Sequence, residues 1–181
     1  MNIKLKNKGI SYVEFILVVS IIFLLTGFAT VTMSIVNKNN VTKAADKIAT
    51  GMNQCKILSL SKGSNKGSIT FAENKGKCYY YYGSNEDKKY YVCSSPCSMK
   101  VIIKGTSYNI SGNQRVKLKI SNVSGHFLGA QLSLDGGENF SPLVYGTADF
   151  TGTNRIEVTN KQGKTAKIDF NIYSGTVDVR Y

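Results

Sequence analysis

Glu14 is the residue whose type and position most clearly require a chemical explanation. It stands at the start of an apolar run from Phe15 to Val36. A charge within lipid costs on the order of 2.5 kcal/mol or more, so this carboxylate needs a partner. The single histidine, His126, cannot build a metal site alone, and no nucleophile, base and acid can be grouped around it. We therefore expect a protein that is not an enzyme and that holds no cofactor and no metal.

The second group of residues that could take part in chemistry is the four cysteines, at positions 55, 78, 93 and 97. Four cysteines allow three sets of pairings. The segments that begin at Cys78 and end at Cys93 are expected to form a hairpin, which places these two residues opposite each other for a disulfide. Cys55 and Cys97 are then left to form the second disulfide. A zinc site is the alternative, but the spacings of the last three cysteines match no usual pair of ligands.

Tyrosines interleaved with lysines form the third group. Tyr80, Tyr82, Lys88 and Lys89 lie in its centre. Aromatic rings beside cations can stack bases or sugars, so these four are candidate ligand-binding residues. Cross-strand packing of alternating tyrosines, with one face on the core, is the alternative, and we favour it.

The overall charge is strongly positive. Lysine and arginine number 23 against 11 acidic residues, which gives a formal net charge of +12. Such a charge attracts DNA and anionic surfaces without identifying a partner. The cations are scattered singly or in pairs, so we favour ordinary solubility as their role.

One helix is expected to position both Glu14 and Cys55. From Phe15 to Val36 it is apolar on every side and rises about 33 Å, enough to cross a bilayer. After Val36 the apolar residues recur at steps of three and four, which indicates an amphipathic continuation to about Lys62. The lysines that precede the apolar run should stay in the cytoplasm and place the rest of the chain outside.

Beyond residue 67, short segments with alternating apolar residues predict strands joined by turns. The apolar face of such strands must be buried, and the second half of the helix can cover it. The expected fold class is α+β, with a long N-terminal helix, transmembrane in its first half, packed on an antiparallel β-sheet head. The expected strands are 68–71, 78–82, 89–93, 100–104, 115–120, 130–134, 154–159, 166–172 and 176–181.

The N-terminal residues and the apolar run behind them resemble the class III leader of type IV prepilins and pseudopilins. Gly9, Ile10 and Glu14 carry the resemblance. In that family a membrane aspartyl peptidase cuts after the glycine and methylates the new N-terminal amine. The resemblance implies that Glu14 neutralises the N-terminus of a neighbouring subunit, since either charge buried alone would be prohibitive. The implied parts are a leader peptide, a transmembrane assembly helix and an extracytoplasmic head, at residues 1–9, 10–36 and 37–181.

Three alternatives to a prepilin leader could account for the apolar run. A conventional signal peptide cut after Ala29 has small residues at Gly27 and Ala29. An uncleaved signal anchor is the second alternative, and neither of these two accounts for Glu14. A buried core helix is disfavoured because the run is apolar on every side.

The second half of the helix and the closing strands are similar in rhythm to the minor pseudopilins of the GspH/FimT family. The resemblance implies a minor type IV pilin or pseudopilin, held in the cell membrane by a single pass and assembled into a surface pilus or a type II secretion pseudopilus. The implied partners are prepilin peptidase, other pilin subunits, the inner assembly platform and the membrane. A pilus-borne binding module that captures DNA for competence, or a surface ligand for adhesion, is the alternative. The similar segments are 44–52, 55–62, 68–71, 155–159, 168–171 and 175–179.

Overall fold

The computed structural model describes residues 11–62, 67–93, 96–137, 139–145 and 152–181, and within its helix it describes the side chains of 11–27 and 40–61. The chain divides into two compact units, Met1–Val36 and Asn37–Tyr181. The backbone is helical over α1 (Tyr12–Lys62), which contributes to both units. The strands of the second unit are β1 (Ser68–Asn74), β2 (Lys77–Tyr82), β3 (Tyr90–Tyr91), β4 (Cys97–Ile103), β5 (Thr106–Ile110), β6 (Arg115–Ile120), β7 (Phe127–Ser133), β8 (Ser141–Tyr145), β9 (Arg155–Asn160), β10 (Thr165–Phe170) and β11 (Val177–Arg180).

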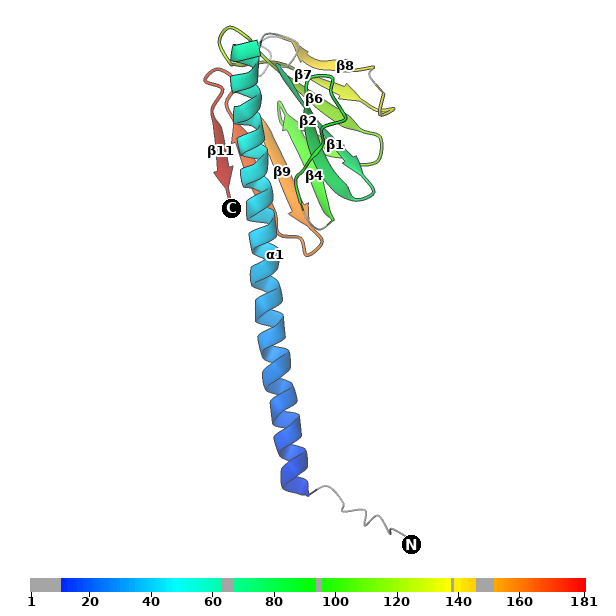
Figure 1. Ribbon diagram of the computed structural model, residues 1–181, viewed down its shortest axis with the longest axis vertical. Helices are drawn as coiled ribbons and strands as arrows, with labels where there is room; N and C mark the ends of the chain where they lie inside the picture. Colours follow the sequence, from blue (N-terminus) through cyan, green and yellow to red (C-terminus); the bar gives the residue numbers. More distant parts are fainter. Residues whose placement is uncertain (1–10, 63–66, 94–95, 138, 146–151) are drawn as a thin grey trace. The chain divides into compact units, whose positions relative to one another are not determined.

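The strands of the second unit form two antiparallel sheets (Figure 1). The six-stranded sheet has the order β3-β2-β1-β6-β7-β8, and the five-stranded sheet has the order β11-β10-β9-β4-β5. In the first sheet, Phe71 of β1 pairs with Tyr80 of β2 on one side and with Val116 of β6 on the other. In the second sheet, Val101 of β4 pairs with Ile156 of β9. Because side chains alternate along a strand, these pairs set one apolar row on one face of each sheet.

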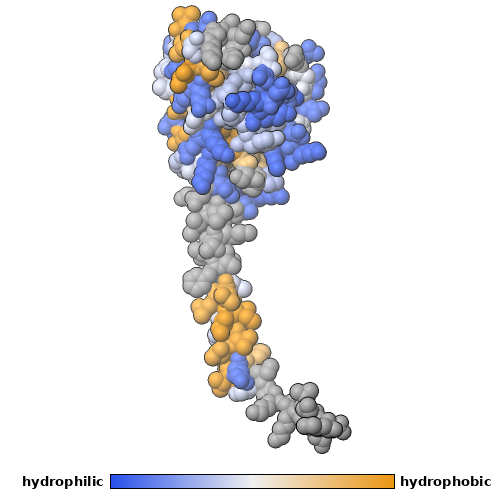
Figure 2. All heavy atoms as spheres, viewed as in Figure 1, coloured by the Kyte–Doolittle hydropathy of each residue, from blue (hydrophilic) through white to orange (hydrophobic). Residues whose placement is uncertain are grey.

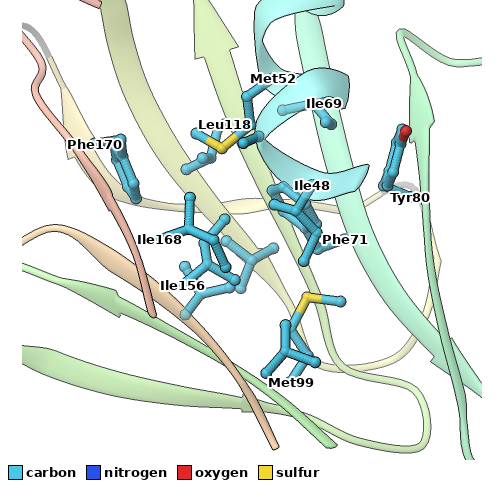
Figure 3. Close-up of a cluster of buried hydrophobic side chains, with 14 of the residues drawn as sticks. Ile48, Met52, Ile69, Phe71, Tyr80, Met99, Leu118, Ile156, Ile168 and Phe170 are labelled. Atoms are coloured by element: carbon cyan, nitrogen blue, oxygen red, sulfur yellow. The ribbon is translucent and has the colours of Figure 1, made fainter. Parts of the chain in front are cut away.

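Both sheets and the second half of α1 share one hydrophobic core (Figure 3). The helix contributes Ala44, Ile48, Met52 and Cys55, each no more than 1% exposed. These positions follow the steps of three and four that put side chains on one face of a helix. Burial of a large apolar side chain is worth about 1.5 to 3 kcal/mol, so this face fixes the helix on the sheets.

The strand predictions are right in place but incomplete. Each of the nine expected segments contains a strand, whereas β5 and β8 were not predicted. Both stand at the edge of a sheet, and β5 has only one fully buried residue, Ile110. An edge strand that faces solvent lacks the alternation of apolar residues that marks a strand in the sequence.

The expected fold class is wrong. Strands make up 41% of the described chain. Helix with described side chains covers only two short stretches, 12–27 and 40–61. No helix among the described residues has both the length and the apolar character needed to cross a membrane. The described architecture is a mainly β unit of two sheets rather than an α+β fold with a long, half-transmembrane helix on one sheet.

Candidate functional site

Apolar side chains cover the described part of the first unit (Figure 2). Phe15, Phe23 and Leu25 expose 59%, 73% and 64% of their surface, and the large apolar residues between them are also exposed except Val19, which is half-buried. We call this surface, residues 12–25, the apolar segment. A contiguous exposed apolar patch on a protein marks a surface that another apolar surface covers.

Glu14 has a partner within its own chain. The backbone N–H of Ser11 donates a hydrogen bond of 2.8 Å to Glu14 Oε2, and the carbonyl oxygen of Ser11 accepts one of 3.0 Å from the N–H of Phe15. An acid at the third helical position that satisfies the N–H of the capping residue is one half of a capping box. The pattern Ser-x-x-Glu was visible in the sequence, so this structural role could have been predicted. Gly9 and Ile10, the predicted processing residues, lie outside the described residues.

The tyrosines of β2 alternate between two faces of their sheet. Tyr80 and Tyr82 face α1, where Tyr80 donates a hydrogen bond of 3.4 Å to the carbonyl oxygen of Lys47. The rings of Tyr80 and Tyr90 are nearly parallel, with centroids 5.3 Å apart. Tyr79 belongs to a separate cluster on the opposite face. The favoured alternative from the sequence, cross-strand packing, therefore describes Tyr80 well.

A pocket of about 410 Å³ lies between α1 and the connection from β2 to β3. We call it the tyrosine pocket. The hydroxyl of Tyr82 donates a hydrogen bond of 3.0 Å to Oε1 of Gln54 on the helix. The ammonium of Lys88 lies 5.6 Å from the ring centroid of Tyr90. Burial raises the pKa of Tyr82, which keeps its hydroxyl a hydrogen-bond donor. The lining consists of Gln54, Ile57, Leu58, Tyr82, Asn85, Lys88 and Tyr90.

Lys89 lies on the other face of the sheet from Lys88. Its ammonium is 5.1 Å from the ring centroid of Tyr79 and 3.3 Å from the carboxylate of Glu86. Arg115 of β6 binds the same carboxylate through two nitrogens, at 2.7 and 3.2 Å. Burial opposes the charge of Glu86, but hydrogen bonds from Arg115 and Lys89 outweigh it and lower the pKa of this carboxyl. This cluster holds the loop after β2 on the sheet.

The structure thus brings together only part of the predicted ligand-binding set. Tyr82 and Lys88 line the tyrosine pocket, Tyr80 lies beneath Tyr90, and Lys89 is bound elsewhere. The amides of Gln54 and Asn85, which also line the pocket, had no signal in the sequence. Aromatic rings, amides and one ammonium can bind a planar or polar ligand without covalent chemistry.

The four cysteines are all thiols in the structure. Tyr80 pairs with Tyr90, and the N–H of Val92 donates a hydrogen bond of 2.9 Å to the carbonyl oxygen of Cys78. Cys78 therefore lies opposite Val92, and the predicted register that placed it opposite Cys93 is wrong by one residue. The register of a hairpin is set by the turn type and the length of its connecting loop, and symmetry about the loop in the sequence does not specify either. Within the described part of the chain, no group of three or more His, Cys, Asp or Glu side chains could hold a metal ion.

No protein-family model matches the sequence, and no curated protein or solved structure matches the chain. With no match to compare, the apolar segment and the tyrosine pocket provide the evidence for a function.

Proposed function

We propose that this chain is a structural subunit of a type IV filament or pseudopilus, that is, a minor pilin or pseudopilin without enzymatic activity. The observation that carries the proposal is the exposed apolar segment with one carboxylate at its start. Exposed apolar surface is unfavourable in water by about 25 cal/mol per Å². Packing of like segments from many subunits removes that surface from water, and a filament core provides such packing.

Glu14 can serve both its own helix and a neighbour. Its hydrogen bond to Ser11 uses Oε2, and a carboxylate has about four acceptor positions. In the proposed mechanism prepilin peptidase cuts between Gly9 and Ile10, and the new amine of one subunit pairs with Glu14 of the next. The assembly platform adds subunits from the membrane, and the second unit lies outside the cell.

The test of this proposal separates the charge of Glu14 from its capping role. Glu14→Gln retains an amide oxygen that can accept the hydrogen bond from Ser11 but has no charge, whereas Glu14→Ala loses both. If the charge pairs with a neighbouring amine, neither variant should enter filaments, because an unpaired buried charge costs about 3 to 5 kcal/mol. Glu14→Asp is the control that retains charge. Immunoblots of sheared-surface and membrane fractions give the readout, and wild-type levels of Glu14→Gln in filaments would contradict the proposal.

Processing provides an independent test. The mature protein should begin at Ile10, and Gly9→Leu should leave an uncleaved precursor, as the resemblance to prepilins implies. Mass spectrometry of the N-terminus decides between this result and cleavage by an ordinary signal peptidase. A mature chain that begins at Thr30 would show that the apolar segment is removed, and the filament proposal would then be wrong.

A second candidate function is capture of DNA or a surface ligand, and the tyrosine pocket favours it. Lys88 and Tyr82 line that pocket beside two amides, which suits a base or another planar group. The full chain in detergent should bind DNA with an affinity that falls steeply with salt. Lys88→Ala should weaken binding more than Lys161→Ala, which removes the same charge from an exposed turn. Equal losses from the two variants would mean that the charge acts generally and the pocket binds nothing.

A further inference from the structure

Three cysteines from three different strands or their flanks meet at one place in the second unit. Cys78 lies in β2 and Cys97 begins β4, and the thiol of Cys78 lies 3.2 Å from the carbonyl oxygen of Cys97, to which it donates. The N–H of Cys97 also donates a hydrogen bond of 3.3 Å to the carbonyl oxygen of Gly76. Cys93 directly follows Val92, which is paired with Cys78. We call Cys78, Cys93 and Cys97 the thiol cluster.

Cys97 is the member that the other two share. Its side chain interacts with the thiols of both Cys78 and Cys93. It is also the most accessible of the three, because it is half-buried whereas Cys78 is fully buried and Cys93 is 7% exposed. An external reagent therefore reaches Cys97 first, and either neighbour can then react with it.

The protonation states agree with this geometry. Hydrogen bonds from Cys78 and then from Cys93 lower the pKa of Cys97, because both stabilise its thiolate. The same bond to Cys97, followed by burial, raises the pKa of Cys78 and of Cys93. Thiolate is the nucleophilic form of cysteine, and Cys97, the most accessible of the three, is the residue that an external disulfide meets first.

We propose that Cys97 is the common partner of two alternative disulfides, one with Cys93 and one with Cys78, and that exchange with an external disulfide forms them. The two bonds have different consequences. Cys78 belongs to the six-stranded sheet and Cys97 to the five-stranded sheet, so a bond between them joins the sheets. A bond between Cys93 and Cys97 closes only the short connection that leads into β4.

The chemistry is thiol–disulfide exchange with a dithiol-oxidising disulfide, written RSSR, which can be a protein or a small molecule. The thiolate of Cys97 attacks one sulfur of RSSR, the S–S bond breaks, and RS⁻ leaves. The sulfur of Cys93 or Cys78 then attacks Cys97, the mixed disulfide breaks, a second RS⁻ leaves, and the thiol proton is released to it. The protein loses two electrons and RSSR gains them. The remaining thiol of the cluster can then attack Cys97 and exchange the partner without further oxidation.

Cys55 is expected to remain a thiol. It is fully buried in the helix that packs on the sheets, and burial raises its pKa to about 12. A thiol that is protonated and inaccessible reacts slowly with disulfides. Oxidation should therefore take the protein from four thiols to two and stop there.

The experiment uses the full chain in detergent, reduced and then exposed to oxidised glutathione as the probe. We expect two thiols to disappear with a loss of about 2 Da, and every bridge found to contain Cys97. Trypsin leaves Cys93 and Cys97 in one peptide and Cys78 in another, and fragmentation before Pro96 separates Cys93 from Cys97. A bridge from Cys78 to Cys93, any bridge to Cys55, or the loss of all four thiols in the wild-type protein would overturn the proposal.

Serine variants test the shared role directly. Cys78→Ser and Cys93→Ser should each still form one bridge to Cys97, whereas Cys97→Ser should form none. Cys55→Ser is the matched control and should oxidise like the wild type. If Cys97→Ser forms a bridge, or if either of the first two variants does not, then Cys97 is not the common partner. The disulfide map of the wild-type protein tests the same point, even if a serine variant folds poorly.

Discussion

Gly51 allows α1 to approach β2, and replacing it with alanine should destabilise the second unit. A Cβ atom at this position would lie 2.6 Å from Cζ of Tyr80 and 2.8 Å from its hydroxyl oxygen. Carbon atoms in contact normally lie about 3.5 to 4.0 Å apart, so the ring must move by about 1 Å. The ring has little room, because Tyr90 is stacked on it and Phe71 lies edge-on at 6.3 Å (Figure 3).

Two opposing effects set the size of the change. Overpacking a core costs about 1 to 3 kcal/mol, whereas alanine in place of glycine inside a helix gains about 1 kcal/mol. Because Tyr80 is confined on both sides and is only 6% exposed, the steric cost should lie in the upper half of its range. We therefore expect Gly51→Ala to lower the free energy of unfolding by about 1 to 2 kcal/mol.

Thermal unfolding of the full chain in detergent, under reducing conditions, should show the melting temperature fall by roughly 3 to 8 °C. Gly27→Ala is the matched control, since no heavy atom lies within 4 Å of a Cβ at that position of the same helix. In a Tyr80→Ala background the clash is removed, so Gly51→Ala should become stabilising. The reasoning is refuted if Gly51→Ala is as stable as the wild type, or if its cost is unchanged in that background.

Two further predictions concern single polar contacts. The pKa of Glu86 is lowered in the folded state, so its contribution to stability is complete above its unfolded pKa of about 4.3 and is lost as pH falls through the folded value. Acid titrations of unfolding should therefore be less steep for Glu86→Gln than for the wild type, and identical curves would contradict this. Ser59, fully buried, donates a hydrogen bond of 3.2 Å to the carbonyl oxygen of Ile120. Ser59→Ala should cost about 1 kcal/mol in denaturant unfolding, whereas Ser61→Ala on the exposed face should change little, and equal effects would count against a role for the buried bond.

The periodic parts of this fold can be predicted from the sequence, whereas the parts that depend on tertiary geometry cannot. The buried face of α1 at Ala44, Ile48 and Met52 follows from spacing alone, because only one face of such a helix can enter a core. The division of the strands into two sheets does not follow, since β4 and β9 pair across more than fifty residues of chain. The position of Cys97 beside Cys78 depends on that division, so hairpin symmetry alone could not predict it.

The tyrosine pocket shows why composition overestimates a binding surface. Lys88 and Lys89 are adjacent in the chain, yet one ammonium lies by Tyr90 and the other by Tyr79 on the opposite face. The pleat of β2 sends alternate tyrosines to opposite faces, and the carboxylate of Glu86, held by Arg115, draws Lys89 away from the pocket. A cluster of aromatics and cations in a strand sequence is therefore divided between two surfaces. The selectivity of the tyrosine pocket then depends on groups from outside the tyrosine cluster. Gln54 of α1 is one of them, and its amide oxygen accepts the hydrogen bond that orients the hydroxyl of Tyr82.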